Sequence, residues 1–186
     1  MNNNFCIKDK EIQIFTNIKG CQFEQYKADP FVYSPMVFGI VGISVNGESY
    51  KITARLKEAQ RFYTTEEVVC LEIEKVAEEN IYSLMDDGEM ITTPVYNTIH
   101  SVEVVTDFQT ISKDSDVKEF THTVGYIFKM IDGLEISFEI GSWYSEMITI
   151  RKGYDLINRF TPVEEFYEEW EDTGFKAECR REIKVI

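Results

Sequence analysis

Runs of β-branched and aromatic residues, separated by short turn sequences, predict that most of this chain forms antiparallel strands. Asn-Gly and Asp-Gly pairs accept the positive φ angles that two-residue hairpin turns need. The clearest predicted hairpin joins Val124–Ile131 to Leu134–Ile140 through Asp132-Gly133. Two more are predicted on the same grounds: Val37–Val45 with Tyr50–Leu56 around Asn46-Gly47, and Ile81–Met85 with Met90–Thr93 around Asp87-Gly88.

Within Leu134–Ile140, apolar residues alternate with Glu135, Ser137 and Glu139. Because successive side chains of a strand point to opposite faces, this alternation predicts one buried face and one solvated face. Further segments with the composition of strands are Glu11–Phe15, Ile99–Val105, Met147–Ile150 and Cys179–Ile186.

The segment Thr64–Asn80 fits two kinds of secondary structure. Thr64 with Glu67 matches a capping box, and several apolar residues keep helical spacing. Apolar and polar residues also alternate here, and the β-branched content together with the following hairpin pattern favours a strand. As a strand, the segment would present Glu72 and Glu74 on one face.

A helix is predicted near the C-terminus. Thr161 can cap it, Pro162 suits its first position, and Glu164 stands where a capping box places an acid. Thr173-Gly174 supplies the stop, because glycine readily adopts the left-handed conformation that ends many helices. The predicted apolar face consists of Val163, Phe166, Tyr167 and Trp170.

These elements predict an α+β fold that is mainly antiparallel β, a bent sheet or partly closed barrel, with the C-terminal amphipathic helix packed on it. We expect residues 1–186 to form one acidic globular domain, with the only plausible minor seam near 112–118. Apolar residues make up 44% of the chain and aromatic residues 13%, which favours a folded domain over disorder.

The start of the chain and its cysteines favour the cytoplasm. No apolar run is long enough to span a bilayer, and the N-terminus lacks the basic start and apolar region of a signal peptide. The four cysteines form no CxxC pair, so we expect them to be small buried hydrophobes in a reducing compartment: Cys6, Cys21, Cys70 and Cys179.

The distribution of charge along the chain indicates what kind of partner the protein binds. The net charge is −14, and residues 61–120 carry 14 acids and 4 bases. A second acidic concentration lies in the predicted helix, where six acids fall within the nine residues from Glu164 to Asp172. Phosphate contacts come from Lys and Arg, so direct binding to nucleic acid or to an anionic membrane is disfavoured, and a basic protein is the expected partner.

We expect the acidic face of the helix to bind this partner first and the mid-chain acids second, while a solvated face that aids solubility remains the simpler interpretation. The helix contains pairs of acids four residues apart, which repel each other. A basic partner would relieve this repulsion. The candidate binding residues are Glu164, Glu165, Glu168, Glu169, Glu171 and Asp172 in the helix, and Glu72, Glu74, Glu78 and Glu79 mid-chain.

Candidate chemistry is sparse. The chain has two histidines, His100 and His122, and neither belongs to a recognisable catalytic pattern. Glu135 and Glu139 stand four residues apart on a strand, about 13 Å, which is too far for a glycosidase pair on their own. The sequence predicts no metal site and no cofactor.

Three functions therefore stay open. The first is a non-enzymatic inhibitor, of the immunity or anti-restriction type, that occupies a basic surface of a nucleic-acid-processing enzyme. The second is a general interaction domain that uses a sheet edge or an aromatic patch at Trp143 and Tyr144. The third is a small enzyme with a carboxylate or histidine site.

Overall fold

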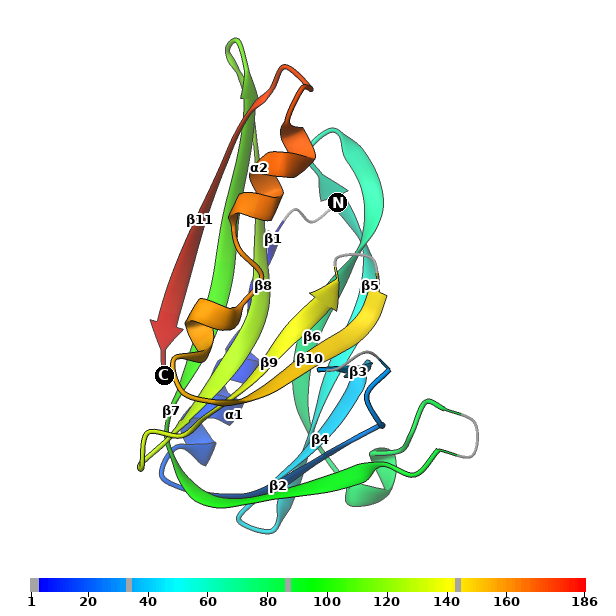
Figure 1. The fold of residues 1–186 in the computed structure, drawn as a ribbon, viewed down its shortest axis with the longest axis vertical. Coiled ribbons are helices and arrows are strands. Elements are labelled where there is room, and N and C mark those ends of the chain that lie inside the picture. Colours follow the sequence, from blue (N-terminus) through cyan, green and yellow to red (C-terminus); the bar gives the residue numbers. More distant parts are fainter. Residues whose placement is uncertain (1–3, 33–34, 86–87, 143–144) are drawn as a thin grey trace.

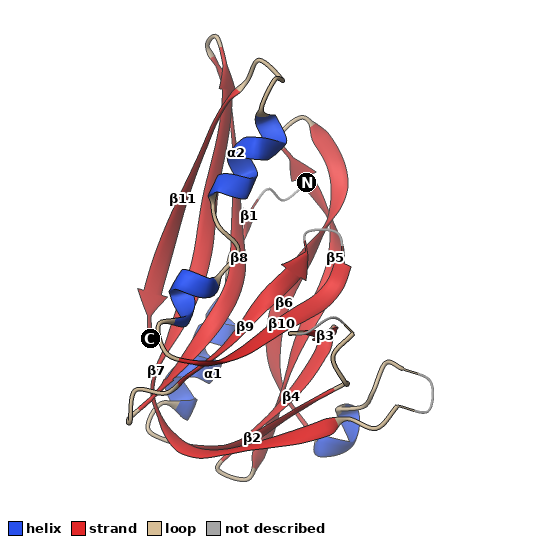
Figure 2. Ribbon diagram, in the orientation of Figure 1, coloured by secondary structure: helices blue, strands red, loops and turns tan. Residues whose placement is uncertain are grey.

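The computed structural model describes residues 4–32, 35–85, 88–142 and 145–186 of the chain, and strands dominate it (Figure 2). The elements are β1 (Asn4–Phe5), α1 (Asp9–Ile18), β2 (Gln22–Ala28), β3 (Met36–Phe38), β4 (Ile40–Val45), β5 (Glu48–Arg61), β6 (Thr64–Val76), the 3-10 turn η1 (Glu78–Asn80), β7 (Ile91–Lys113), β8 (Asp116–Met130), β9 (Glu135–Ser142), β10 (Ser145–Gly153), the 3-10 turn η2 (Leu156–Arg159), α2 (Glu164–Trp170) and β11 (Lys176–Val185).

Within the described residues the strands form one 11-stranded sheet, in the order β3-β10-β9-β8-β7-β2-β4-β5-β6, with β1 beside β8 and β11 beside β7. The long strand β7 belongs to both halves of this sheet. Its residues 91–98 pair with β2, whereas 99–113 pair with β8 on one side and 103–112 with β11 on the other. The sheet is therefore bent and not closed (Figure 1), and the predicted α+β class with a bent antiparallel sheet is confirmed.

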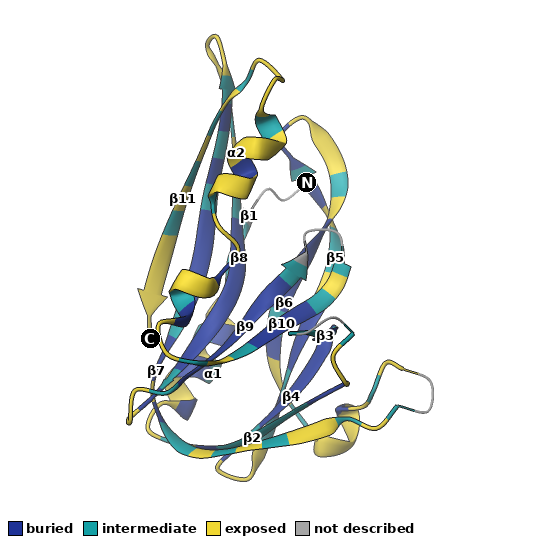
Figure 3. Cartoon of the chain, in the orientation of Figure 1, coloured by how far each residue is buried: buried dark blue, intermediate teal, exposed yellow. Residues whose placement is uncertain are grey.

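Two apolar clusters hold the bent sheet together. The larger one lies between the two halves and includes Phe15, Phe23 and Phe128, whose rings meet edge to face. The smaller one lies under α2, where Phe166 packs with Phe62 of the β5–β6 hairpin. Figure 3 shows that the central strands, such as β8 and β9, are largely buried, whereas most of α2 is exposed.

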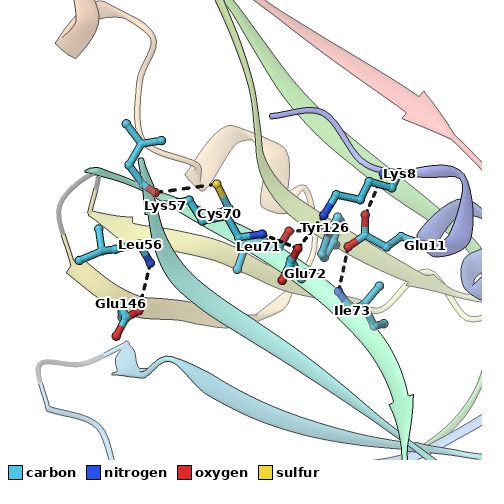
Figure 4. Close-up of polar contacts among 11 residues, drawn as sticks. Lys8, Glu11, Leu56, Lys57, Cys70, Leu71, Glu72, Ile73, Tyr126 and Glu146 are labelled. Atoms are coloured by element: carbon cyan, nitrogen blue, oxygen red, sulfur yellow. Dashed lines mark hydrogen bonds and ion pairs between the residues drawn. The ribbon is translucent and has the colours of Figure 1, made fainter. Parts of the chain in front are cut away.

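The segment Glu11–Phe15 is helical, so its predicted strand is wrong. The alternation of apolar residues there concealed an amphipathic helix whose Phe15 and Ile18 are buried. Glu11 is buried as well, and it serves two elements: Oε2 accepts the Lys8 backbone N–H at 2.8 Å, and Oε1 accepts the Ile73 N–H of β6 at 3.2 Å (Figure 4). The first contact caps α1, and the second ties it to the sheet.

Two of the predicted hairpins are confirmed. Asn46 and Gly47 have φ angles of 49° and 73° between β4 and β5, as a two-residue turn requires. Gly133, with φ of 87°, lies in the turn between β8 and β9. The remaining strand predictions over Ile99–Val105, Met147–Ile150 and Cys179–Ile186 coincide with β7, β10 and β11.

The hairpin predicted across residues 81–93 is wrong, because residues 81–85 and 88–90 contain no strand and β7 begins at Ile91. Side chains hold this segment in another shape: Asp29 Oδ2 accepts the Leu84 N–H at 3.2 Å, and Ser83 Oγ accepts the Met85 N–H at 3.0 Å. Such side-chain contacts compete with strand pairing. Asp87 of the predicted turn lies outside the described residues.

The segment Thr64–Asn80 contains β6, which pairs with β5 along its whole length, so the strand interpretation is confirmed. The predicted solvated face of Leu134–Ile140 is wrong, because Glu135, Ser137 and Glu139 are all buried. Both faces of β9 are covered. Glu135 and Glu139 accept hydrogen bonds from neighbouring segments, whereas the Ser137 hydroxyl has no partner in the described structure.

The C-terminal helix packs on the sheet as predicted, but it begins later. α2 starts at Glu164, and no side chain caps it. The Thr161 backbone N–H donates to Glu139 Oε1 at 2.6 Å, and Val163 takes the N-cap position. Of the predicted apolar face, Phe166 is buried, Val163 and Trp170 are half-buried, and Tyr167 is 39% exposed. The helix also ends earlier than predicted, at Trp170, and Asp172, with a φ of 63°, takes the left-handed conformation that we expected of Gly174.

Candidate interaction site

The mid-chain acids on β6 are matched by lysines of the same molecule. Glu72 Oε1 lies 2.6 Å from Lys57 Nζ and 2.7 Å from Lys8 Nζ. Burial alone would raise the pKa of Glu72, but the hydrogen bonds from Lys57 and Lys8 outweigh it and lower the pKa to about 2. Figure 4 shows Glu72 beside Lys8 in this network. Glu72 therefore acts as a structural link between α1, β5 and β6.

Two of the three candidate acids that follow Glu72 in the chain are also paired with lysines. Glu74 lies on the same face of β6 as Glu72, as predicted, and its Oε1 is 3.2 Å from Lys51 Nζ. Glu78 of η1 pairs with Lys27 at 2.7 Å, and the hydrogen bond lowers the pKa of its carboxyl. Glu79 is exposed and makes no ion pair within the described part of the chain. Three of the four mid-chain candidates are thus already neutralised.

In α2, Glu169 differs from its neighbours because it turns toward the sheet. Its two carboxylate oxygens accept hydrogen bonds from Arg61 Nη1 and Nη2 at 2.6 and 2.7 Å. Arg61 is 3% exposed, and its guanidinium lies 5.3 Å from the centre of the Phe62 ring. This bidentate pair fastens α2 to the β5–β6 hairpin, so Glu169 has a structural role.

The other acids of α2, and the two acids directly after it, face solvent. Glu164, Glu165, Glu168, Glu171 and Asp172 are exposed, and the described residues offer them no ion-pair partner. They form what we name the acidic face. Most of them border an open groove of about 820 Å³ between α2 and the start of β11, which is lined by Glu164, Tyr167, Glu168, Trp170, Glu171, Asp172, Gly174, Phe175 and Ala177.

Aromatic side chains form part of this groove. Trp170 and Phe175 meet edge to face, with ring centres 5.5 Å apart, and Tyr167 donates its hydroxyl to the Cys179 carbonyl at 3.1 Å. The Trp170 indole N–H is buried and has no hydrogen-bond acceptor in the described structure. The groove therefore combines fixed aromatic surface with unneutralised carboxylates. Trp143 and Tyr144, the predicted aromatic patch, lie outside the described residues.

Several buried charges surround a cavity of about 300 Å³ beneath the start of α2, and sequence reasoning missed them. Asp107 accepts from Arg181 Nε and Nη2 at 2.7 and 2.8 Å. Glu139 accepts from Arg151 at 2.5 Å as well as from Thr161. Each carboxylate is balanced by a guanidinium, which is how buried charges are tolerated. No local sequence signal foretells these pairs, because Arg181 lies 74 residues from Asp107 and Arg151 lies on the strand that follows Glu139.

The histidines and the thiols form no recognisable catalytic arrangement within the described residues. His122 is fully buried and its Nε2–H donates to the Val69 carbonyl at 2.6 Å. Burial lowers the pKa of His122 to about 4. His100 is exposed on β7. All four cysteines are free thiols, and burial raises the pKa of both Cys70 and Cys179 to about 12, which keeps them protonated at neutral pH.

The described residues contain no group of three or more His, Cys, Asp and Glu side chains placed to hold a metal ion. In the same part of the chain, no helix has the length and apolar character needed to cross a membrane.

Comparisons with known proteins give no family for this chain. No model of a protein family, no curated protein and no solved structure matches it.

Proposed function

We propose that the protein is a non-enzymatic acidic inhibitor whose acidic face occupies a basic surface of another protein, most simply the nucleic-acid-binding surface of an enzyme. The observation that carries this proposal is the contrast between two acidic stretches of the same chain. Glu72, Glu74 and Glu78 are paired with lysines, whereas the five acids of the acidic face, three in α2 and two directly after it, are exposed and carry no partner in the described structure.

Like charges that are left close together on one helix cost stability, because Glu164/Glu168 and Glu168/Asp172 stand four residues apart. A basic partner would relieve that repulsion and would be steered toward the protein by its negative field. The rings of Tyr167, Trp170 and Phe175 would then supply the apolar contact that sets how long the complex lasts.

A pull-down at low and at moderate salt, from cells that produce the protein, tests the proposal. The test variant carries Glu164→Gln, Glu165→Gln, Glu168→Gln and Glu171→Gln. Glu169 is left unchanged, because its replacement would break the pair with Arg61 and confuse loss of binding with loss of structure. We expect the wild type to retain a basic nucleic-acid enzyme, to inhibit that enzyme after purification, and to do so less well as salt increases.

The matched control carries Glu58→Gln, Glu67→Gln, Glu79→Gln and Glu89→Gln, four exposed acids outside α2 that change the net charge equally. If the α2 variant fails to retain the enzyme and the control variant retains it, the acidic face is the binding surface. Equal loss with both variants would mean that net charge, and not this face, governs binding. Retention by both would contradict the proposal.

The free thiols support a reducing compartment, and we propose the cytoplasm as the setting in which the protein acts.

A further inference from the structure

The outer edge of β11 is open along the second half of the strand. β11 pairs with β7 on one side, and within the described residues no strand pairs with it on the other (Figure 1). Ile183 and Val185 near its end are 44% and 61% exposed. Exposed strand edges are templates for pairing with another strand, and proteins generally cover or blunt them.

Backbone hydrogen bonds fix which residues of β11 face outward. Ile186 and Val102 exchange two backbone bonds, at 2.9 and 3.3 Å, so the even-numbered residues of β11 bond to β7. The N–H and C=O groups of odd-numbered residues therefore point away from β7. At Cys179 both groups contact the Tyr167 hydroxyl of α2, at 3.4 and 3.1 Å, and this side chain closes the first half of the edge. The outward backbone groups of Arg181, Ile183 and Val185 have no hydrogen-bond partner among the residues that the structure describes.

We infer that two copies of this chain pair through β11, antiparallel and centred on Ile183. In this register Ile183 lies opposite Ile183 of the second copy, and Arg181 lies opposite Val185. Each closely bonded pair exchanges two backbone bonds, so the interface gains about six. Lys184 lies opposite Glu182, and the symmetry repeats this pair, which puts opposite charges side by side twice.

Charge and the position of α2 exclude the neighbouring registers. A register centred on Glu182 or on Lys184 would place like charges directly opposite each other. A register centred on Arg181 would bring Ile183 of the second copy onto Cys179, where Tyr167 already occupies the edge. The register centred on Ile183 avoids both conflicts, and for this reason a second copy fits the edge better than an arbitrary peptide.

The pairing would also set the arrangement of the two acidic faces. Ala177 and Cys179 pack against the cluster that contains Phe166, so α2 lies on the side of the sheet to which odd-numbered residues of β11 point. A twofold axis through Ile183 keeps both copies of that side on one face of a continuous sheet. The inference itself rests on β11 alone and stands whether or not the acidic face binds a basic enzyme.

Sedimentation equilibrium of the full chain, over a range of protein concentrations in moderate salt, tests this inference. We expect a reversible monomer–dimer equilibrium for the wild type. Glu182→Lys alone, or Lys184→Glu alone, turns both symmetric attractions into repulsions and should weaken the dimer about tenfold. The double variant Glu182→Lys/Lys184→Glu restores opposite charges and should recover most of the affinity.

Ile183→Pro is the second variant. It removes an outward N–H that makes no bond to β7, so the monomer should keep its circular dichroism spectrum while the dimer is lost. A wild type that stays monomeric at the highest concentration would overturn the inference. A dimer that persists in the Ile183→Pro variant, or single charge variants that the double variant does not rescue, would place the interface elsewhere or in another register.

Discussion

The strand β6 and the helix α2 are both rich in acids, but the two sets of acids differ in how many form ion pairs. On β6, Glu72 and Glu74 contact lysines from α1 and β5, and the pKa of Glu72 falls to about 2. On α2, Glu169 alone reaches a guanidinium within the described part of the chain, that of Arg61. The comparison separates acids that hold the fold together from acids that the described structure leaves without a partner.

The difference teaches that a run of acids in a sequence says little about the charge that a surface presents. Neutralisation depends on which bases the fold brings alongside. Cross-strand neighbours such as Lys51 reach the acids of β6, whereas the outer side of α2 has no neighbouring element in the described structure to supply a base. The strength of the field near α2 follows from that exposure.

The largest effect that we predict concerns the anchoring of β6 to β8 by His122. Its folded-state pKa of about 4 is below the usual 6.5, so the folded protein binds fewer protons than the unfolded chain between these values. The stabilisation is complete above pH 6.5 and is lost as pH falls toward 4, by about 3 kcal/mol in total. Urea unfolding between pH 7 and pH 4 measures it.

The control for this prediction is His122→Gln, whose amide can still donate to the Val69 carbonyl but does not titrate. We expect its stability to fall less steeply than that of the wild type between pH 6.5 and 4. Identical slopes for the two proteins would show that the titration of His122 does not contribute to the pH dependence of stability.

The second prediction concerns the one acid of α2 that resembles those of β6. Glu169→Gln leaves the buried Arg61 without its bidentate partner and should lower the free energy of unfolding by about 2 kcal/mol, less than for a fully buried pair because Glu169 is 40% exposed. Glu168→Gln, one residue away and without a partner, is the matched control and should not lose stability. Equal losses of stability in the two variants would contradict the assignment of a structural role to Glu169 but not to Glu168.

The third prediction concerns the acid dependence of β6. Because the pKa of Glu72 is depressed, its stabilisation is present above pH 4.5 and is lost as pH falls toward 2. Lys8 is 54% exposed, so solvent screening limits the contribution to about 1 kcal/mol. Glu72→Gln should be less stable than the wild type at pH 7, and the two should converge near pH 2. A constant difference across this range would contradict the assignment of Glu72.

Much of the fold could be predicted from local patterns. Turn pairs such as Asn46-Gly47 identify hairpins because few residues accept positive φ, and β-branched residues identified β6. The failures have tertiary causes. Glu11–Phe15 alternates like a strand but forms a helix that Glu11 caps and ties to β6, and residues 81–90 are shaped by contacts that include one from Asp29.

Less of the candidate site could be predicted. The sequence singled out the acids of α2, but it could not separate Glu169 from Glu168, because the distinction depends on Arg61, 108 residues away. Nor could it foresee the burial of Glu139, which depends on Arg151 and on the Thr161 backbone. Ion pairs between distant segments have no local signature, so a single sequence shows the charges without their partners.

The smallest effect gives the most direct test of the central claim, that the acids of β6 hold the fold whereas those of α2 are free for a partner. Urea unfolding at pH 7 compares Glu72→Gln/Glu74→Gln with Glu168→Gln/Glu171→Gln, two variants that change the net charge equally. We predict that the first loses about 1 kcal/mol and that the second gains about 0.5 kcal/mol, because like-charge repulsion and an unfavourable helix-end charge are removed. A loss from the α2 variant as large as that from the β6 variant would contradict the account.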